Sequence, residues 1–200
     1  YARKFDELKD ALNLSYDKFT RTTDPYHIRA AQEFWKLCDK NGDIEKKIYK
    51  VKYCVGCELE KTESELVDGR CPLHPNLEIE TIEEENYFFR LTRYAQPLLE
   101  HIERHPEFIQ PDARRNEIVN VIRGGLEDIS VSRANATWGI PLPIAGAESH
   151  RVYVWFDALI NYLSAVGFAD PTAEGKARFD SCWPADLHVI GKDITRFHCI

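Results

Sequence analysis

Two short residue pairs in the first half of the chain have the types and spacing of a metal site. Cys54 and Cys57 form a Cys-x2-Cys pair, and Cys71 and His74 form a Cys-x2-His pair after a polar stretch. A two-residue gap lets a tight turn aim both side chains at one point, and three thiolates with one neutral imidazole fill the four positions of tetrahedral zinc. Because no position is left for water, the sequence predicts a structural zinc ion rather than a catalytic one.

The residues inside these pairs and the remaining cysteines bear on that prediction. Gly56 is expected to supply a positive φ in the first turn, and Pro72 stiffens the second. The alternatives to zinc are a disulfide or buried free thiols. Cys38, Cys182 and Cys199 are scattered and no secretory signal is visible, which favours a reducing compartment and a metal.

The segments that flank the cysteine pairs have the patterns of folded elements. A helix is predicted from Asp24 to Gly42, because Asp24 is a good N-cap, Pro25 suits the first helical position and Asn41-Gly42 supplies a stop. Hydrophobic periodicity predicts the other elements. These are a strand at 48–53, a strand at 77–89, a helix at 89–105 with Pro97 as a kink or boundary, and a helix at 114–123 that stops at Gly124-Gly125.

The last third of the chain twice repeats a strand followed by a helix. The first unit is an apolar strand at 151–156 that continues into a helix with apolar residues at three- and four-residue spacing. The second is a strand at 187–190, a turn at Gly191, and a helix that Asp193 would cap. Two such units predict a parallel sheet, and open parallel sheets bind ligands at the carboxyl ends of their strands.

This arrangement would bring Trp155 and Tyr162 from the first unit to Asp193 and His198 from the second, at a candidate ligand pocket. A plainer interpretation stands beside it. An aromatic stripe at helical spacing usually belongs to a core, a histidine near a helix start is usually structural, and Asp193 is first of all a capping residue.

Composition limits the functions that the chain can have. It has 200 residues, 44% of them hydrophobic, a net charge of -7 and no methionine. The acidic balance gives no overall attraction to nucleic acid, so any RNA contact needs a local patch. No segment resembles a membrane span or a targeting peptide, which predicts a cytoplasmic protein without membrane contact. The charged start at Tyr1 and the helical turn at Ile200 predict an internal piece of a longer polypeptide.

Six collinear motifs resemble methionyl-tRNA synthetases, and together they cover nearly the whole chain. They are FTRTTDPYH (19–27), ENYFFRL (85–91), GLEDISVSR (125–133), WGIPLP (138–143), YVWFDALINY (153–162) and IGKDITRFH (190–198). The resemblance implies an α/β fold: a Rossmann-type class I catalytic domain in residues 1–40 and 150–200, interrupted by a connective-peptide insertion at 41–149 that carries the zinc knuckle.

The resemblance also implies substrates and residue roles. The family joins methionine to ATP, with Mg²⁺, and transfers the methionyl group to tRNA. Arg133 and Asp193 are the implied catalytic residues, and Gly191 and Asp193 the implied contacts with the aminoacyl-adenylate. Leu159 stands where some relatives have proline. The residues implied to bind the methionine side chain are Trp155, Ala158, Leu159, Tyr162, Ile194, Phe197 and His198.

Neither an H-I-G-H-like nor a K-M-S-K-S-like motif occurs in the 200 residues, so we expect the isolated chain to be inactive. Two alternatives remain at this point. The chain is a zinc-binding module that contacts RNA or protein, or it is a piece of another class I aminoacyl-tRNA synthetase. The sequence does not determine an oligomeric state.

Overall fold

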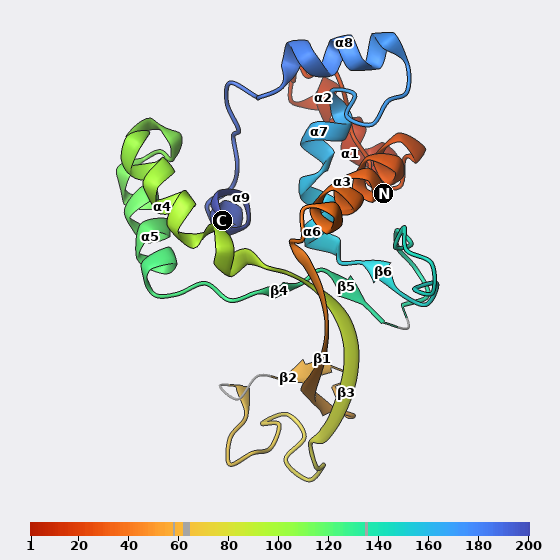
Figure 1. Cartoon of the computed structure of the whole chain (residues 1–200), viewed down its shortest axis with the longest axis vertical. Helices are drawn as coiled ribbons and strands as arrows, with labels where there is room; N and C mark the ends of the chain where they lie inside the picture. The colour runs from red at the N-terminus through yellow and green to blue at the C-terminus, as the bar shows by residue number, and fades with distance from the viewer. Residues whose placement is uncertain (58, 62–64, 135) are drawn as a thin grey trace.

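The chain combines helices with a long, curved antiparallel ribbon, which extends away from the helices (Figure 1). The structure is a computed structural model that describes residues 1–57, 59–61, 65–134 and 136–200. In chain order the elements are α1 (Ala2–Asp6), α2 (Leu8–Ala11), α3 (Pro25–Lys40), β1 (Ile44–Cys54), β2 (Leu59–Lys61), β3 (Glu80–Phe89), η2 (Leu91–Tyr94), α4 (Ala95–Arg104), η3 (Pro106–Phe108), α5 (Asp112–Arg123), β4 (Ile129–Ser130), β5 (Ser132–Arg133), β6 (Arg151–Val152), α6 (Val154–Leu159), α7 (Asn161–Ala165), α8 (Ala173–Cys182), η4 (Lys192–Ile194) and α9 (Thr195–Cys199). In the described part of the chain, no helix is long and apolar enough to cross a membrane.

Helix α3 begins and ends where the sequence predicts. Asp24 has an extended backbone, and its carbonyl accepts the N–H groups of His27 and Ile28. At the other end Gly42 has a φ of 74°, a left-handed conformation that glycine adopts without steric cost. The helix buries one face in the main hydrophobic core of the chain. Residues of that core are Ala31, Trp35, Cys38, Ile44, Val131, Ile140, Leu142, Ala147 and Val152.

The ribbon is built from β1 and β3, which pair antiparallel from Ile44↔Phe89 to Tyr53↔Glu80. β2 lies on the outer edge of β1, and β4 lies on the outer edge of β3. Both long strands were predicted, although β1 begins earlier than the expected 48–53 and β3 begins later than the expected 77–89. The ribbon carries the cysteine pairs to its far end, away from the helices (Figure 1).

A buried carboxylate fixes the ribbon where it leaves α3. Asp43 is 2% exposed and accepts hydrogen bonds from Arg93 and Tyr94, each at 2.7 Å. The hydrogen bond from Asn41 lowers the pKa of Asp43, and the hydrogen bond from Tyr94 and the positive charge of Arg93 lower it further. Burial alone would raise this pKa, but these contacts outweigh it. A buried charge with this many partners holds its neighbours in one geometry, so β1 and the turn η2 have a fixed relation at the base of the ribbon.

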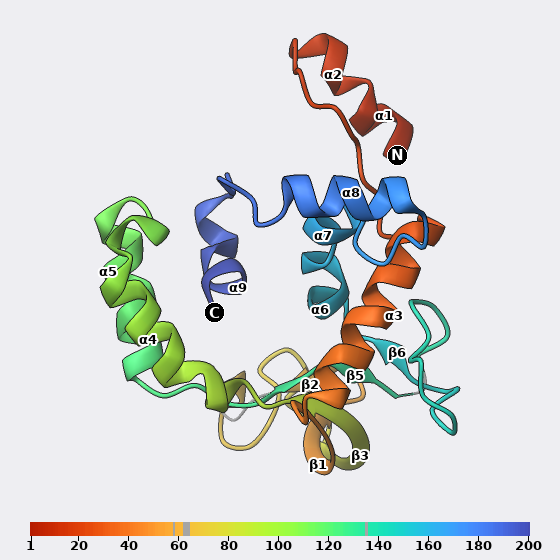
Figure 2. The ribbon, with the colours of Figure 1, turned by 45° about the horizontal axis from the view of Figure 1, so that its top comes forward.

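The helices α4 and α5 form a hairpin beside the C-terminal end of the chain (Figure 2). Their shared core of four isoleucines also packs against Cys199 and Ile200. The predicted helix at 89–105 is divided, because a 3₁₀ turn precedes α4. Pro97 lies in the first turn of α4, where its missing N–H is tolerated, so it marks a boundary rather than a kink. The predicted helix at 114–123 begins two residues earlier.

Several predictions for the last third are wrong. Of the strand predicted at 151–156, only residues 151–152 form a strand, β6, which pairs antiparallel with β5. Helix α6 already begins at Val154. Residues 187–190 form no strand; Leu187 and Val189 are 76% and 87% exposed, and no strand among the described residues pairs with them. All ladders of the described residues are antiparallel, which contradicts the predicted parallel sheet.

The second helix of this region also starts differently from the prediction. Gly191 precedes the 3₁₀ turn η4, and Asp193 lies inside that turn. Helix α9 follows, with Ile194 at its N-cap. Asp193 is therefore not a helix cap. Its carboxylate is exposed at the surface of the turn.

Candidate functional sites

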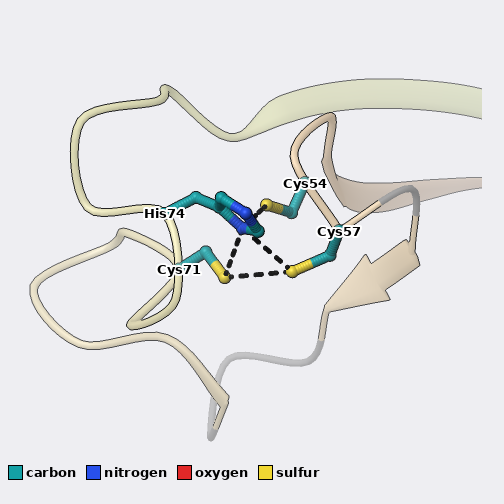
Figure 3. Close-up of side chains that lie close together, drawn as sticks. All are labelled: Cys54, Cys57, Cys71 and His74. Atoms are coloured by element: carbon teal, nitrogen blue, oxygen red, sulfur yellow. Dashed lines mark hydrogen bonds between the residues drawn. The ribbon is translucent and has the colours of Figure 1, made fainter.

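The four predicted metal ligands converge at the far end of the ribbon (Figure 3). Their donor atoms, three Sγ and the Nδ1 of His74, all lie within 4.8 Å of one another. Cys57 Sγ is 3.5 Å from Cys71 Sγ and 3.2 Å from His74 Nδ1. Tetrahedral zinc with its usual bond lengths needs about 3.8 Å between two sulfurs and about 3.6 Å between sulfur and nitrogen. The cluster could therefore hold a metal ion with small adjustments.

Gly56 serves this cluster by leaving room for the imidazole of His74. A Cβ atom at position 56 would lie 2.6 Å from two carbons of the His74 ring. The expected positive φ is wrong, since Gly56 is not among the residues with positive φ. Glycine is needed here because the ligand ring approaches the backbone closely.

The electrostatics of the cluster favour one thiolate before any cation binds. Burial opposes ionisation of Cys71, but hydrogen bonds with His74 and Cys57 outweigh it and lower the pKa of Cys71 to about 6. Burial and the hydrogen bonds with Cys71 and Cys54 raise the pKa of Cys57 to about 11. All three cysteines can be thiolates together only when a bound cation supplies positive charge that offsets their mutual repulsion.

A second candidate site lies among the helices. A cavity of about 790 Å³ opens between the α4–α5 hairpin, α7, the segment 183–192 and α9. This volume is in the range of small-molecule sites. Four of the predicted methionine-binding residues line it, namely Leu159, Tyr162, Phe197 and His198.

The polar centre of this cavity is a pair formed by Tyr162 and His198. The Tyr162 hydroxyl is 2.7 Å from His198 Nε2, and His198 Nδ1 is 2.9 Å from the carbonyl of Ile194. Because that carbonyl can only accept, Nδ1 carries the proton and Tyr162 donates to Nε2. Burial raises the pKa of Tyr162. The hydroxyl proton of Tyr162 is therefore already engaged.

The other three predicted residues, Trp155, Ala158 and Ile194, are not among the lining residues of this cavity. Trp155 and Phe197 stack with ring centroids 4.5 Å apart and an interplanar angle of 9°. Ala158 and Leu159 lie on α6 with Trp155, and both are half-buried. Trp155 and Tyr162 of the first unit contact Phe197 and His198 of the second, brought together by loop and helix instead of a parallel sheet, while Asp193 is exposed in its turn.

The structure places the two implied catalytic residues apart. Asp193 and Gly191 belong to the exposed turn before α9. Arg133 lines a different cavity, together with Tyr153, over whose ring its guanidinium lies at 3.9 Å. Within the described residues, no contact joins Arg133 to Asp193.

A buried histidine that the sequence analysis did not single out holds the pocket helices. His27 on α3 is fully buried, its Nδ1 is 3.0 Å from Ser164 Oγ on α7, and its Nε2 is 3.8 Å from Asp157 on α6. Ser164 donates its own proton to the carbonyl of Asn161, so His27 donates to Ser164. These are the residue types of a hydrolase triad, but the serine proton points away and all three groups are buried. His27 instead links α3 to the two consecutive helices α6 and α7.

Other cavity residues also escaped the sequence analysis. His188 lies edge-on to the Tyr162 ring with a centroid distance of 4.8 Å, and Trp183 lies next to His188. His101 and His105 line the opposite wall. His188 lies in a loop and carries no periodic signal, so only the tertiary fold could place its ring beside Tyr162.

Comparisons with known proteins agree on one family. The family model described as "tRNA synthetases class I (M)" matches residues 1–81 and 74–200. The chain is 48% identical over 195 residues to a methionine–tRNA ligase of Clostridium perfringens, which covers 97% of this chain and 29% of that protein. It is 47% identical over 198 residues to the methionine–tRNA ligase of Synechocystis, covering 98% of this chain and 37% of that protein.

A solved structure agrees with these relatives. The Mycobacterium tuberculosis methionyl-tRNA synthetase in complex with methionyl-adenylate superimposes with a TM-score of 0.81 at 44% identity. The match covers 99% of this chain and 39% of that one. The chain thus spans about a third of the length of the curated relatives it matches. The collinear match over the whole chain does not favour a free-standing zinc module or a different class I synthetase.

Proposed function

Because this chain belongs to the methionyl-tRNA synthetase family of class I tRNA synthetases, we propose that it is the central part of an ATP-dependent ligase that joins methionine to its tRNA. In the first step the carboxylate of methionine attacks the α-phosphate of ATP and displaces pyrophosphate. In the second a ribose hydroxyl of the terminal adenosine attacks the acyl carbon and displaces AMP. The observation that carries the proposal is the aromatic cavity between α7 and α9.

In this proposal the methionine side chain lies in that cavity. A thioether is polarisable and prefers an apolar wall with aromatic rings, which Phe197 provides from its stacked position on Trp155. The half-buried Tyr162–His198 pair supplies the polar element of the cavity. Contacts between the sulfur and the aromatic rings would favour methionine over a purely hydrocarbon side chain of the same length. The residues proposed to contact the side chain are Trp155, Ala158, Leu159, Tyr162, Ile194, Phe197 and His198.

The turn before α9 is proposed to contact the aminoacyl-adenylate. A Cβ atom at Gly191 would meet no atom within 4 Å, so this backbone is open to a ligand. Asp193 presents an exposed carboxylate that can accept from an amine or a hydroxyl. Arg133 is proposed to act on the phosphates of ATP, which enters with Mg²⁺ as a substrate. In that role Arg133 would stabilise charge that develops in the transition state.

We propose that the ribbon holds a structural zinc ion through Cys54, Cys57, Cys71 and His74. The donor set is the one that zinc prefers, and it fills all four positions. We further propose that residues 1–40 and 150–200 belong to a Rossmann-type catalytic domain and residues 41–149 to its insertion. The hydrogen bond between His27 and Ser164 supports this arrangement, because it joins the two outer segments directly. Val131, Ile140, Leu142 and Ala147 also belong to the core that α3 packs on, so the end of the proposed insertion packs on the proposed catalytic part.

Calorimetric titration of the zinc-loaded chain with methionine tests the pocket. We expect saturable binding that is stronger for methionine than for norleucine, which replaces the sulfur by a methylene group. Equal affinities for both ligands would contradict a sulfur-selective pocket. A pyrophosphate-exchange assay on the same 200 residues tests the second part of the proposal. We expect no turnover, because neither ATP motif lies within them, and clear turnover would contradict that expectation.

A further inference from the structure

The α4–α5 hairpin stands apart from α3, α6 and α7, with α9 between them (Figure 1, Figure 2). The hairpin side of the proposed methionine cavity is lined by residues that include His101 and His105 of α4, Phe108 of η3 and Arg114 of α5. The hairpin has a core of its own, the four isoleucines, which is separate from the core of α3. The width of the cavity therefore depends on contacts that hold the hairpin from outside the α3 core.

The hairpin also acts on the pocket through α9. Cys199 and Ile200, at the end of this helix, pack on the isoleucine core. The same helix carries Phe197 and His198, which line the cavity and contact the aromatic residues of α6 and α7. Because close-packed groups transmit a displacement to their neighbours, a shift of the hairpin would move one wall of the cavity and the two side chains on α9 together.

The turn η2 joins the ribbon to the hairpin, and a carboxylate at the base of the ribbon holds this turn. Arg93 Nη1 donates to Asp43 Oδ1 and the Tyr94 hydroxyl donates to Asp43 Oδ2, each at 2.7 Å. Arg93 also donates to the carbonyl of Gly42 at 3.1 Å. Because Asp43 is 2% exposed, water competes little for these charge-assisted hydrogen bonds.

A second carboxylate holds the same turn from the segment that leaves the hairpin. Asp128 Oδ1 accepts the Thr92 hydroxyl at 2.7 Å and the Thr92 N–H at 3.2 Å, and Asp128 Oδ2 accepts Lys47 Nζ of β1 at 3.0 Å. Burial raises the pKa of Asp128, but the hydrogen bonds from Thr92 and Lys47 outweigh burial and lower this pKa. Two carboxylates on different segments thus hold the consecutive residues 92–94, and together they form the η2 clamp.

We propose that Asp43 and Asp128 are positioning residues for methionine binding: through the η2 clamp they hold the α4–α5 hairpin and α9 at the separation that the pocket requires. Neither carboxylate is among the residues that line the cavity, so each acts through the turn that it holds. The inference rests on the proposed function, because it takes methionine as the ligand of this cavity. Loss of a clamp contact should weaken methionine binding although no group that touches the ligand has changed.

Thr92 gives the mildest test, in pyrophosphate exchange by the full-length enzyme. Thr92→Val removes the hydroxyl that donates to Asp128 and keeps the shape of the side chain, whereas Thr92→Ser keeps the hydroxyl. We expect Thr92→Val to raise the KM for methionine by about three- to tenfold and Thr92→Ser to retain the wild-type value. Lost ground-state binding leaves kcat and the KM for ATP unchanged, whereas general instability would lower kcat. Thr81→Val, at an exposed position of β3, is the control.

Asp43→Asn should act in the same direction and more strongly. The amide would turn an NH₂ group toward Arg93 or Tyr94, which are both donors, and it removes the charge that pairs with Arg93. We expect the KM for methionine to rise by about tenfold or more. Asp39→Asn makes the same change of charge on the exposed side of α3 and should leave this KM unchanged. If the Asp43 variant does not fold, the comparison of the two Thr92 variants decides.

Hydrogen exchange tests the η2 clamp without enzymatic activity. In the full-length protein, Thr92→Val should speed exchange of the amides in 95–123 and 195–200 and leave those of α3 unchanged. Unchanged exchange in these two segments, or faster exchange with an unchanged KM for methionine, would overturn the proposal. If the wild type shows no pyrophosphate exchange, the proposed ligase function fails, and calorimetric methionine affinities of the two Thr92 variants decide the proposal in place of KM.

Discussion

The cysteine knuckle and the aromatic pocket are stabilised by different means. Between residues 54 and 79, the described side chains that are buried are those of Cys54 and Cys71. The helices around the pocket pack instead on apolar cores: α4, α5 and α9 on the four isoleucines, and α6 through Phe156 on the core around Trp35, whose indole Phe156 and Tyr87 contact edge to face. A segment with so little buried apolar surface cannot offset its conformational entropy, so the knuckle depends on a metal, whereas the pocket depends on packing.

This difference explains why one site was visible in the sequence and the other required three dimensions. Metal ligands are close in sequence because short turns position them. The pocket takes residues from α4, α7, α9 and the segment 183–192. These lining residues are spread along the chain from His101 to Cys199. The predictions below test whether the knuckle and the pocket are as independent as this contrast implies.

The largest effect is expected from Cys71→Ala. Structural zinc sites contribute about 10–16 kcal/mol of binding free energy, which is coupled to local folding. Loss of one thiolate should release the metal and unfold residues 54–79, while the α3 core keeps its protection against hydrogen exchange. Metal analysis with hydrogen-exchange mass spectrometry measures both. Cys182→Ala, an exposed thiol outside the cluster, is the control. If the Cys71→Ala variant kept one zinc ion per chain and unchanged hydrogen exchange, the knuckle would not depend on its metal.

His27→Ala should destabilise the pocket side and leave the knuckle intact. The change leaves a cavity at a fully buried position and removes the donor to Ser164. We expect a loss of about 2–4 kcal/mol in the free energy of unfolding by urea. His27→Asn keeps an amide donor near the position of Nδ1 and should recover part of the loss. A change in zinc content on this substitution would show that the two regions are coupled.

Gly56→Ala acts inside the knuckle without removing a ligand. The new methyl group would displace the imidazole of His74, since it would lie 2.6 Å from two ring carbons. Outer contacts of this kind alter metal affinity by about 10–100-fold, and we expect a decrease in that range. Competition with a chromophoric chelator measures it. Val55→Ala changes the neighbouring exposed side chain and should have no effect. Equal zinc affinity in both variants would show that His74 is not held by this close contact.

The smallest effect is expected from Tyr162→Phe. The change leaves Nε2 of His198 without the donor that lies at 2.7 Å. In the free variant water can reach the half-buried Nε2, whereas bound methionine would exclude that water, so the unmade hydrogen bond costs about 1 kcal/mol in the complex and methionine affinity should fall by about fivefold. Calorimetry measures it, and Tyr153→Phe, the same change beside the other cavity, serves as the control. If Tyr162→Phe bound methionine as tightly as the wild type, the Tyr162–His198 pair would not contribute to recognition.

Local chemistry was well predicted from the sequence. The limits of α3 follow from Asp24, Pro25 and Gly42, and the metal cluster follows from the spacing of its four ligands. The errors occur where a residue depends on distant partners. The segment 187–190 is apolar and extended, but an extended segment becomes a strand only when a neighbouring strand supplies its hydrogen bonds. The role of Gly56 was misjudged because the close approach of His74 is not visible in the sequence.

The sequence by itself determined the elements and groups that depend on near neighbours: the two ends of α3, the two long strands, the metal ligands and the family motifs. Only the tertiary structure decided which atom accepts the proton of the Tyr162 hydroxyl, that His27 joins α3 to α7, and that Arg133 pairs across the strands with Arg151. The physical reason is one of range. Turn geometry and helix capping act over a few residues, whereas hydrogen bonds and charges between distant segments depend on how the whole chain packs.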